Sequence, residues 1–126
     1  MKQHKSDKAY LWDMREAALE AVEYLRGVTL ESFLADPLRM RAIERTLEII
    51  GEAAYHTSDE TRKANAEIPW QAIIGQRHVL AHEYGEIDSA RLYTVVTLHL
   101  PRLIAILDAA GLAPSFLRQM KPKSVS

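Results

Sequence analysis

The stretch DPLRMRAIERTLEIIGEAAYH, residues 36–56, predicts a long amphipathic helix. Asp36 is a good N-cap residue, and Pro37 suits the first helical turn, where its missing N–H is not needed. The apolar residues that follow recur at a spacing of three or four, which places them on one face of the helix. They are Ile43, Leu47, Ile50 and Ala54, with Met40 and Ala53 at the edges of the face.

Helical spacing also covers most of the chain on either side of this segment. We expect long helices over residues 7–26, 69 to 82 or 84, and 88–110, and short helical stretches at 29–35 and 58–65. Pro101 is expected to kink the last helix because proline removes a backbone donor. Strand signals are almost absent. The pattern predicts an all-α, up-and-down bundle of four long helices plus short ones, in one domain over residues 1–126 with a C-terminal tail at 112–126.

Composition narrows the classes of function that the chain can have. It has 126 residues and no cysteine, which excludes a disulfide framework and a thiolate metal site. Its formal net charge of −1 argues against strong, sequence-blind nucleic-acid binding, although a few arginines suffice to hold one phosphate. No apolar run approaches the roughly 20 residues of a membrane span, and no apolar signal core follows the charged N-terminus. We therefore expect a cytoplasmic protein without membrane contact.

The segment GQRHVLAHEYG, residues 75–85, gathers titratable and charged side chains at the end of a predicted helix. At about 100° per residue, Arg77 and Tyr84 lie on one stripe, and His78 and His82 lie on another. Arg77 and His82 are about 140° apart around the axis. They would converge only if the helix ends or bends near His82, or if a two-fold axis clusters two copies of the set.

These residue types suit RNA cleavage without a metal ion. A 2′-hydroxyl must lose a proton to attack the phosphorus, and the departing 5′-oxygen must gain one. Histidine can do either task near neutral pH. The planar guanidinium of Arg77 matches phosphate oxygens and would stabilise the charge that builds on the phosphorane. Tyr84 can orient the phosphate or stack on a base.

Two other interpretations of this segment remain open. A histidine near a helix end is usually a capping or surface residue. His78 and His82 also have the spacing of metal ligands, but no third ligand stands at a recognisable spacing and the H-E-x-x-H pattern is absent. We therefore predict no metal site and no cofactor.

The run from Arg77 to Tyr84 matches the R-x4-H-x-Y motif of HEPN ribonucleases, and the chain resembles the HepT toxins of that superfamily. Gly51-Glu52-Ala53, Ile68-Pro69-Trp70 and Ile87-Asp88 also resemble that family in order and spacing. The resemblance extends from the first helix to about Leu107.

The resemblance implies a homodimer in which the motifs of both subunits line one cleft. It implies a metal-independent endoribonuclease that acts as the toxin of a type II toxin–antitoxin pair, with Arg77 and His82 as the catalytic pair. His78 occupies a position that is usually polar in the family and, like Tyr84, would position the substrate. The implied antitoxin is an MNT-type minimal nucleotidyltransferase that attaches AMP to Tyr84, which would block RNA by charge and by volume. Glu52 is a speculative partner that could orient Arg77 or a histidine.

Two competing functions are compatible with the same residues. The near-neutral charge would suit a non-catalytic helical module that binds a nucleotide and docks a minimal nucleotidyltransferase. A purely structural dimerisation bundle is the weaker alternative. The RNA that is cleaved, the position of the cut and the modification state of Tyr84 do not follow from the sequence.

Overall fold

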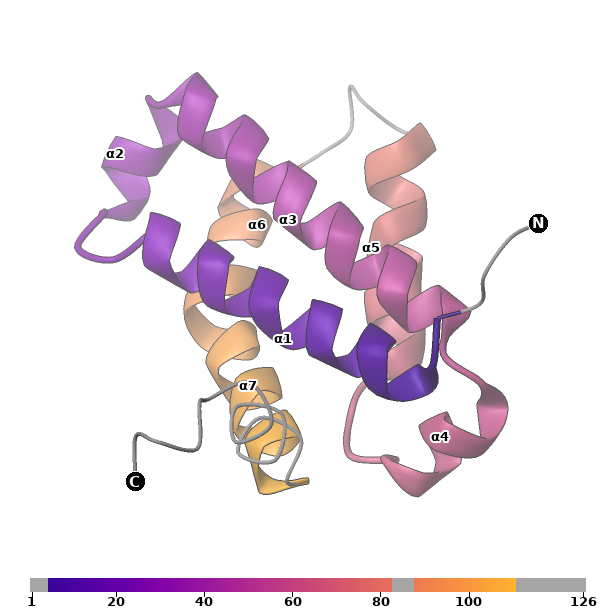
Figure 1. The fold of residues 1–126 in the computed structure, drawn as a ribbon. Helices are drawn as coiled ribbons and strands as arrows, with labels where there is room; N and C mark the ends of the chain where they lie inside the picture. Colours follow the sequence, from indigo (N-terminus) through magenta and orange to yellow (C-terminus); the bar gives the residue numbers. More distant parts are fainter. Residues whose placement is uncertain (1–4, 83–87, 111–126) are drawn as a thin grey trace, which may run out of the picture.

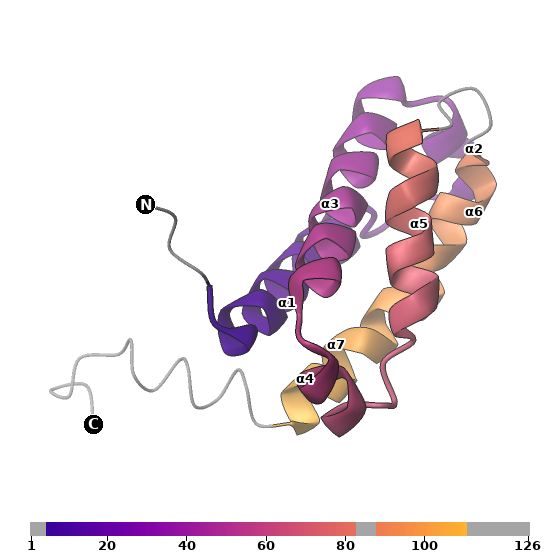
Figure 2. The same ribbon diagram turned by 90° about the vertical axis from the view of Figure 1, so that its right-hand side faces the viewer.

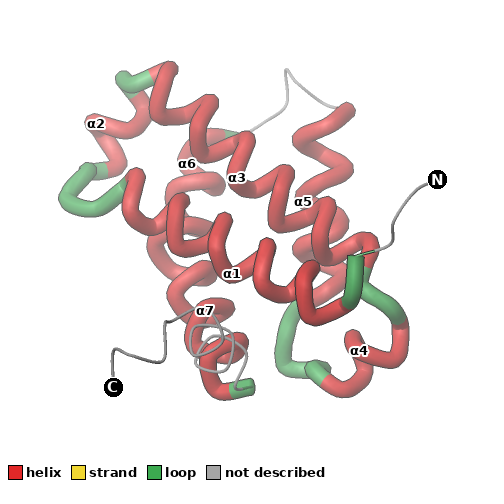
Figure 3. Tube along the Cα trace, in the orientation of Figure 1, coloured by secondary structure: helices red, strands yellow, loops and turns green. Residues whose placement is uncertain are grey.

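In the computed structural model, described for residues 5–82 and 88–110 and for the side chains of 5–76 and 88–110, every regular element is helical (Figures 1 and 3). The prediction of an all-α fold is confirmed. The elements are α1 (Asp7–Tyr24), α2 (Leu30–Leu34), α3 (Pro37–His56), α4 (Asp59–Ala64), α5 (Trp70–His82), α6 (Ser89–Thr94), the π-helical segment η2 (Val95–His99) and α7 (Leu100–Ala109).

The helices begin where the sequence places N-cap residues. Each cap side chain accepts a hydrogen bond from a backbone N–H in the first turn, which satisfies a donor that has no partner within the helix. The five capping residues are Ser6, Thr29, Asp36, Ser58 and Asp88.

The first helix is shorter than predicted. It ends at Tyr24, two residues before Arg26, and Leu25 and Arg26 form a turn that leads into Gly27. Gly27 has a φ of 74°, a left-handed conformation that glycine adopts without the cost of a Cβ clash. The sequence therefore identified the stop residue but not the last helical turn before it.

The long helices form two antiparallel pairs that cross. Figure 1 shows α1 and α3 side by side and running in opposite directions, with α5 and the α6–α7 run crossing behind them. Figure 2 shows α5 beside α3, and α3 packs against both α1 and α5. The second pair is also joined to the first by the packing of α7 against α1. This arrangement makes α3 the central helix.

The core lies where the apolar faces of these helices meet. The prediction for α3 is confirmed, since Ile43, Leu47, Ile50 and Ala54 are all buried. Burial of such side chains contributes about 1.5–3 kcal/mol for each large residue. The fully buried large side chains from the other elements are Met14, Phe33, Ile68, Leu92, Val96 and Leu107.

Pro101 widens a turn of the last helix instead of ending it. The backbone stays helical from Ser89 to Ala109, and the N–H of Leu100 donates to the carbonyl of Val95, five residues earlier. Proline lacks an N–H and its ring collides with the carbonyl four residues before it, here that of Thr97. A π-helical turn directly before the proline is one known response of a helix to such crowding.

The helical run Ser89–Ala109 is also long and apolar enough to cross a membrane by length and composition alone. It has 21 residues, and an 18-residue window reaches a mean hydropathy of 1.4. The sequence prediction missed this because polar residues interrupt every strictly apolar run. One face of the helix packs into the core through Leu92, Val96 and Leu103, and 28% of the apolar window is buried inside the structure.

Asp7 joins the start of α1 to the start of α4. Its carboxylate accepts hydrogen bonds from the hydroxyl and the backbone N–H of Ser58 and from the hydroxyl of Thr61. The hydrogen bond from the Ser58 hydroxyl, followed by that from Thr61, lowers the pKa of Asp7 below its ordinary value of 3.8. Since the ionised form is favoured in the folded state, this contribution to stability is present above the unfolded pKa and is lost as pH falls through the folded pKa.

We therefore expect Asp7→Asn to be less stable than the wild type at pH 6, and the difference to shrink below about pH 4. Urea unfolding followed by circular dichroism at pH 6, 4 and 3 measures the free energy of unfolding of both proteins. Glu20→Gln removes an exposed carboxylate from the same helix and controls for the change in net charge. A stability difference that is the same at pH 6 and pH 3 would contradict this assignment.

Candidate active site

The predicted motif lies on the last turns of α5. Arg77, His78 and His82 are all within the helix Trp70–His82, as the sequence predicted, while their side chains lie outside the described residues. Tyr84 lies outside the described residues altogether. Because the backbone is helical through His82, Arg77 and His82 are separated by about 140° around the axis. A bend of the backbone before His82 therefore does not bring them together.

The start of α5 is firmly anchored, which fixes the direction of the motif helix. Ile68 and Trp70 are both buried, with 2% and 8% of their surface exposed. The indole Nε1 of Trp70 donates to the backbone carbonyl of Asn65 at 3.1 Å. This hydrogen bond spans the short connection between α4 and α5, which contains Pro69. Further along, Ile73 and Ile74 pack against the core. Motion at the start of α5 would have to break these contacts.

The end of α5 is an electrostatically suitable place for cations. The last carbonyls of an α-helix carry a partial negative charge, which stabilises positive side chains in the final turn by about 0.3–1 kcal/mol. Arg77, His78 and His82 all occupy the last six positions of α5.

Glu52 lies on α3, the helix that packs against α5. Its carboxylate is 3.3 Å from Nε2 of His56, one turn later on the same helix, and the side chain is exposed. His56 in turn stacks on Tyr10 of α1, with ring centroids 5.6 Å apart. Glu52 also lines a cavity between α1 and α3. A role in orienting Arg77 remains a prediction, because the side chain of Arg77 lies outside the described residues.

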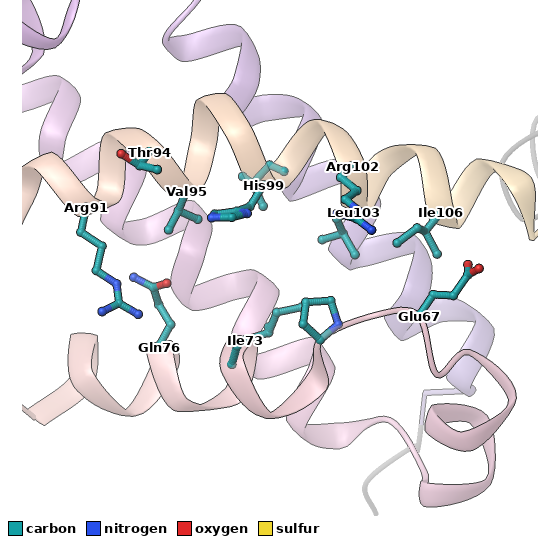
Figure 4. A pocket seen from close by; sticks show the side chains of 13 residues that line it. Glu67, Ile73, Gln76, Arg91, Thr94, Val95, His99, Arg102, Leu103 and Ile106 are labelled. Atoms are coloured by element: carbon teal, nitrogen blue, oxygen red, sulfur yellow. The ribbon is translucent and has the colours of Figure 1, made fainter.

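A groove runs along α5 on the side that faces α6 and α7. It has a volume of about 550 Å³, and Figure 4 shows side chains from both sides pointing into it. Its floor is apolar, with Ile73 from α5 facing Val95 and Leu103. We call it the α5–α7 groove. Gln76, the residue directly before Arg77, lies at one end of it, opposite Arg91 (Figure 4).

Three basic residues of the α5–α7 groove were missed at the level of the sequence. Arg91, His99 and Arg102 all line it from the α6–α7 run, and all three are exposed. These three residues lie beside the apolar face on which the prediction of this helix rested. A signal was nevertheless present in the sequence. Each of these basic residues directly precedes a leucine of the apolar face, so the basic residues repeat along the helix with the same spacing as those leucines.

No group of three histidine, aspartate or glutamate side chains gathers in a metal-binding arrangement among the residues whose side chains the structure describes. His78 and His82 are not among them.

Comparison with known proteins agrees with the motif. The family model "Ribonuclease HepT-like" matches residues 14–110. A protein of Thermococcus cleftensis named "Probable ribonuclease HepT" is 35% identical over 99 residues, which cover 79% of this chain and 90% of that protein. A candidate RNase of Caldanaerobacter subterraneus is 32% identical over 99 residues, covering 79% of this chain and 88% of the relative.

A candidate RNase of Methanocaldococcus jannaschii is 31% identical over 96 residues, covering 76% of this chain and 88% of the relative. No solved structure gave a significant match. The family match begins within α1 and extends to the end of α7, so it includes α3, α5 and the residues of the motif. On these grounds the chain belongs to the HepT-like ribonuclease family.

Proposed function

We propose that this protein is a metal-independent endoribonuclease in which Arg77 and His82 perform the reaction. The observation that carries the proposal is the ordered set Arg77, His82 and Tyr84 in the sequence of a ribonuclease family member, with Arg77 and His82 on the last turns of an anchored helix. RNA is the substrate class, and His78 and Tyr84 position the strand.

The reaction follows from the chemistry of the side chains. An imidazole takes the proton of a 2′-hydroxyl, the 2′-oxygen forms a bond to phosphorus, and the bond from phosphorus to the 5′-oxygen breaks. A second imidazole gives a proton to the departing 5′-oxygen. The products are a 2′,3′-cyclic phosphate and a 5′-hydroxyl. Arg77 stabilises the negative charge of the phosphorane through its planar pair of donors.

We further propose that two copies of the chain form the active unit. Arg77 and His82 are about 140° apart around the axis of a continuous helix, so their positions lie on different faces of one copy. A two-fold axis beside the end of α5 would place two guanidinium groups and two imidazoles around one phosphodiester. The two imidazoles would then supply both the acid and the base. Light scattering of the purified protein should therefore give twice the mass of the 126-residue chain.

The biological setting is a proposal that rests on the family. We propose a cytoplasmic toxin that is neutralised by an MNT-type nucleotidyltransferase through attachment of AMP to Tyr84. Intact mass of the protein produced with and without that partner tests this step. Addition of one adenylyl mass per chain that is lost in Tyr84→Phe supports it, whereas unchanged mass in the presence of an active partner contradicts it.

The decisive experiment is cleavage of RNA by the purified protein in EDTA. We expect wild type to cut single-stranded RNA and to leave 2′,3′-cyclic phosphate ends, and His82→Ala, purified identically, to leave the RNA intact. The identical purification controls for contaminating nucleases. If the wild-type protein does not cut RNA and does not arrest growth when expressed, yet still binds the neighbouring nucleotidyltransferase, the ribonuclease proposal is wrong and a non-catalytic nucleotide-binding and docking module becomes the better explanation.

A further inference from the structure

Most other arginines in the part of the chain that the structure describes have an acidic partner, whereas the two arginines of the α5–α7 groove and Arg41 of α3 have none. The side chains of Arg15, Arg26, Arg39, Arg45 and Arg62 each lie 3.8 Å or less from a carboxylate oxygen. In the described part of the chain, Arg91 and Arg102 make no such pair. Their positive charges are therefore available to an anionic ligand.

The π-helical segment keeps these basic residues in one row. Groove-lining residues occur at 91, 95, 99, 102 and 106, and each directly precedes a buried residue at 92, 96, 100, 103 or 107. Four turns of α-helix take about 14.4 residues, whereas residues 92–107 span 15 steps. The wide turn at Val95–His99 absorbs the excess, so that His99 lines the groove and Leu98 faces outward with 64% of its surface exposed.

Basic and acidic side chains are distributed unevenly along the groove. Two guanidinium groups and the imidazole of His99 lie on the α6–α7 side, while Glu67 is the acidic residue among those that line the groove, and it lies at the far end beside Ile106 (Figure 4). Gln76 and Arg91 mark the opposite end, directly next to the motif. A positive potential therefore extends from the motif along most of the groove.

The combination of an apolar floor and a basic rim fits a single strand of RNA. Unpaired bases bury their faces against apolar surfaces, and phosphates pair with arginine. Arg91 and Arg102 are 11 residues apart, about 16 Å along the helix axis. At the roughly 3.4 Å rise of a stacked strand, this distance corresponds to about five nucleotides.

We propose that the α5–α7 groove holds the RNA strand beside the cleavage site, with Arg91 and Arg102 pairing with its phosphates. The inference rests on the proposed ribonuclease function, because it takes the end of α5 as the place of the scissile bond. It assigns substrate-positioning roles to residues outside the motif. It also explains how a chain with a net charge of −1 can bind RNA, since two arginines without an acidic partner among the described residues line the same groove.

The test is the salt dependence of RNA binding. Fluorescence anisotropy of a labelled single-stranded RNA of about 16 nucleotides is measured with His82→Ala protein, which leaves the RNA uncut. Each phosphate contact to a single strand contributes about 0.7 to the slope of log Kd against log salt. Adding Arg91→Ala and Arg102→Ala should reduce the slope by about 1.4 and weaken binding about 20-fold at 0.1 M salt.

Two further variants separate charge from structure. Arg91→Lys with Arg102→Lys keeps both charges and should retain the slope of the parent. Arg26→Ala with Arg45→Ala removes two exposed arginines from other faces and should leave both slope and affinity unchanged. If the alanine pair at 91 and 102 binds RNA with the parent slope, the groove proposal is wrong.

The outcomes distinguish this inference from the proposed function. Cleavage by wild type together with an unchanged slope in the groove variant would overturn the groove and leave the ribonuclease intact. A reduced slope without any cleavage by wild type would support the groove and overturn the ribonuclease. If the alanine pair instead halves the mass measured by light scattering, the groove is a contact between two copies of the chain, and the inference fails.

Discussion

Arg77→Lys is expected to slow RNA cleavage about 100-fold, and Arg77→Ala about 1000-fold. Lysine keeps the positive charge but presents a single ammonium in place of the planar guanidinium, which can donate two parallel hydrogen bonds to a phosphate. The reaction needs this donor pair most when charge accumulates on the phosphorane. The loss should therefore appear in the single-turnover rate at saturating protein, with a smaller effect on RNA affinity.

The matched control makes the same chemical change elsewhere. Arg26→Lys alters an exposed arginine at the end of α1 whose partner is Glu23, and it should cleave RNA at the wild-type rate. Circular dichroism and light scattering of the Arg77 variants should match wild type. If Arg77→Lys retains a rate within a few-fold of wild type, Arg77 acts only as a general positive charge and the proposed bidentate contact is wrong.

Phe33→Ala is expected to produce the largest loss of stability, about 3–5 kcal/mol. Phe33 is the main buried residue of the short helix α2, and its side chain is fully buried. Its ring packs against Tyr93 of α6, with centroids 5.8 Å apart and planes tilted by 43°. Truncation removes this contact and leaves a cavity between α2, α3 and α6, which the surrounding helices fill only in part.

Urea unfolding measures the effect. With a slope of about 1–3 kcal/mol per molar, the midpoint should fall by about 2 M. Phe33→Leu should give a smaller loss and keeps the test usable if the alanine variant does not fold. Leu38→Ala, at a leucine that is 82% exposed two residues into α3, should change stability by no more than about 0.5 kcal/mol. Equal losses at Phe33 and Leu38 would contradict the packing described here.

The secondary structure followed from the sequence because its signals are local. Asp36 was expected to cap a helix, and the helices expected at 7–26, 58–65 and 88–110 begin beside Ser6, Ser58 and Asp88. Each of these four residues accepts a hydrogen bond from the first turn. A cap acts within three residues, so it can be recognised without knowledge of the rest of the fold. The end of α1 was placed two residues too late for a related reason, since helix ends fray and are set by weak turn interactions.

The candidate site could be predicted only in part. The motif identified which side chains have the right chemistry, and the structure places Arg77, His78 and His82 at the end of α5 as expected. The α5–α7 groove could not be predicted, because it depends on how α5 lies across from α6 and α7. Arg91 and Arg102 follow the motif in the sequence and come to share one groove with Gln76, the residue before Arg77, only through this tertiary packing.

The wide turn at Val95–His99 has a consequence for how this chain could change by a single deletion. A π-helical turn holds one residue more than the α-helical turn that it replaces. Deletion of a single residue there would restore regular winding and leave the buried leucines on both sides in place. Arg91 and Arg102 each directly precede one of these leucines, so both would keep their positions beside the groove. One lost codon would thus change only the middle of the groove, around His99, without redesign of the interior.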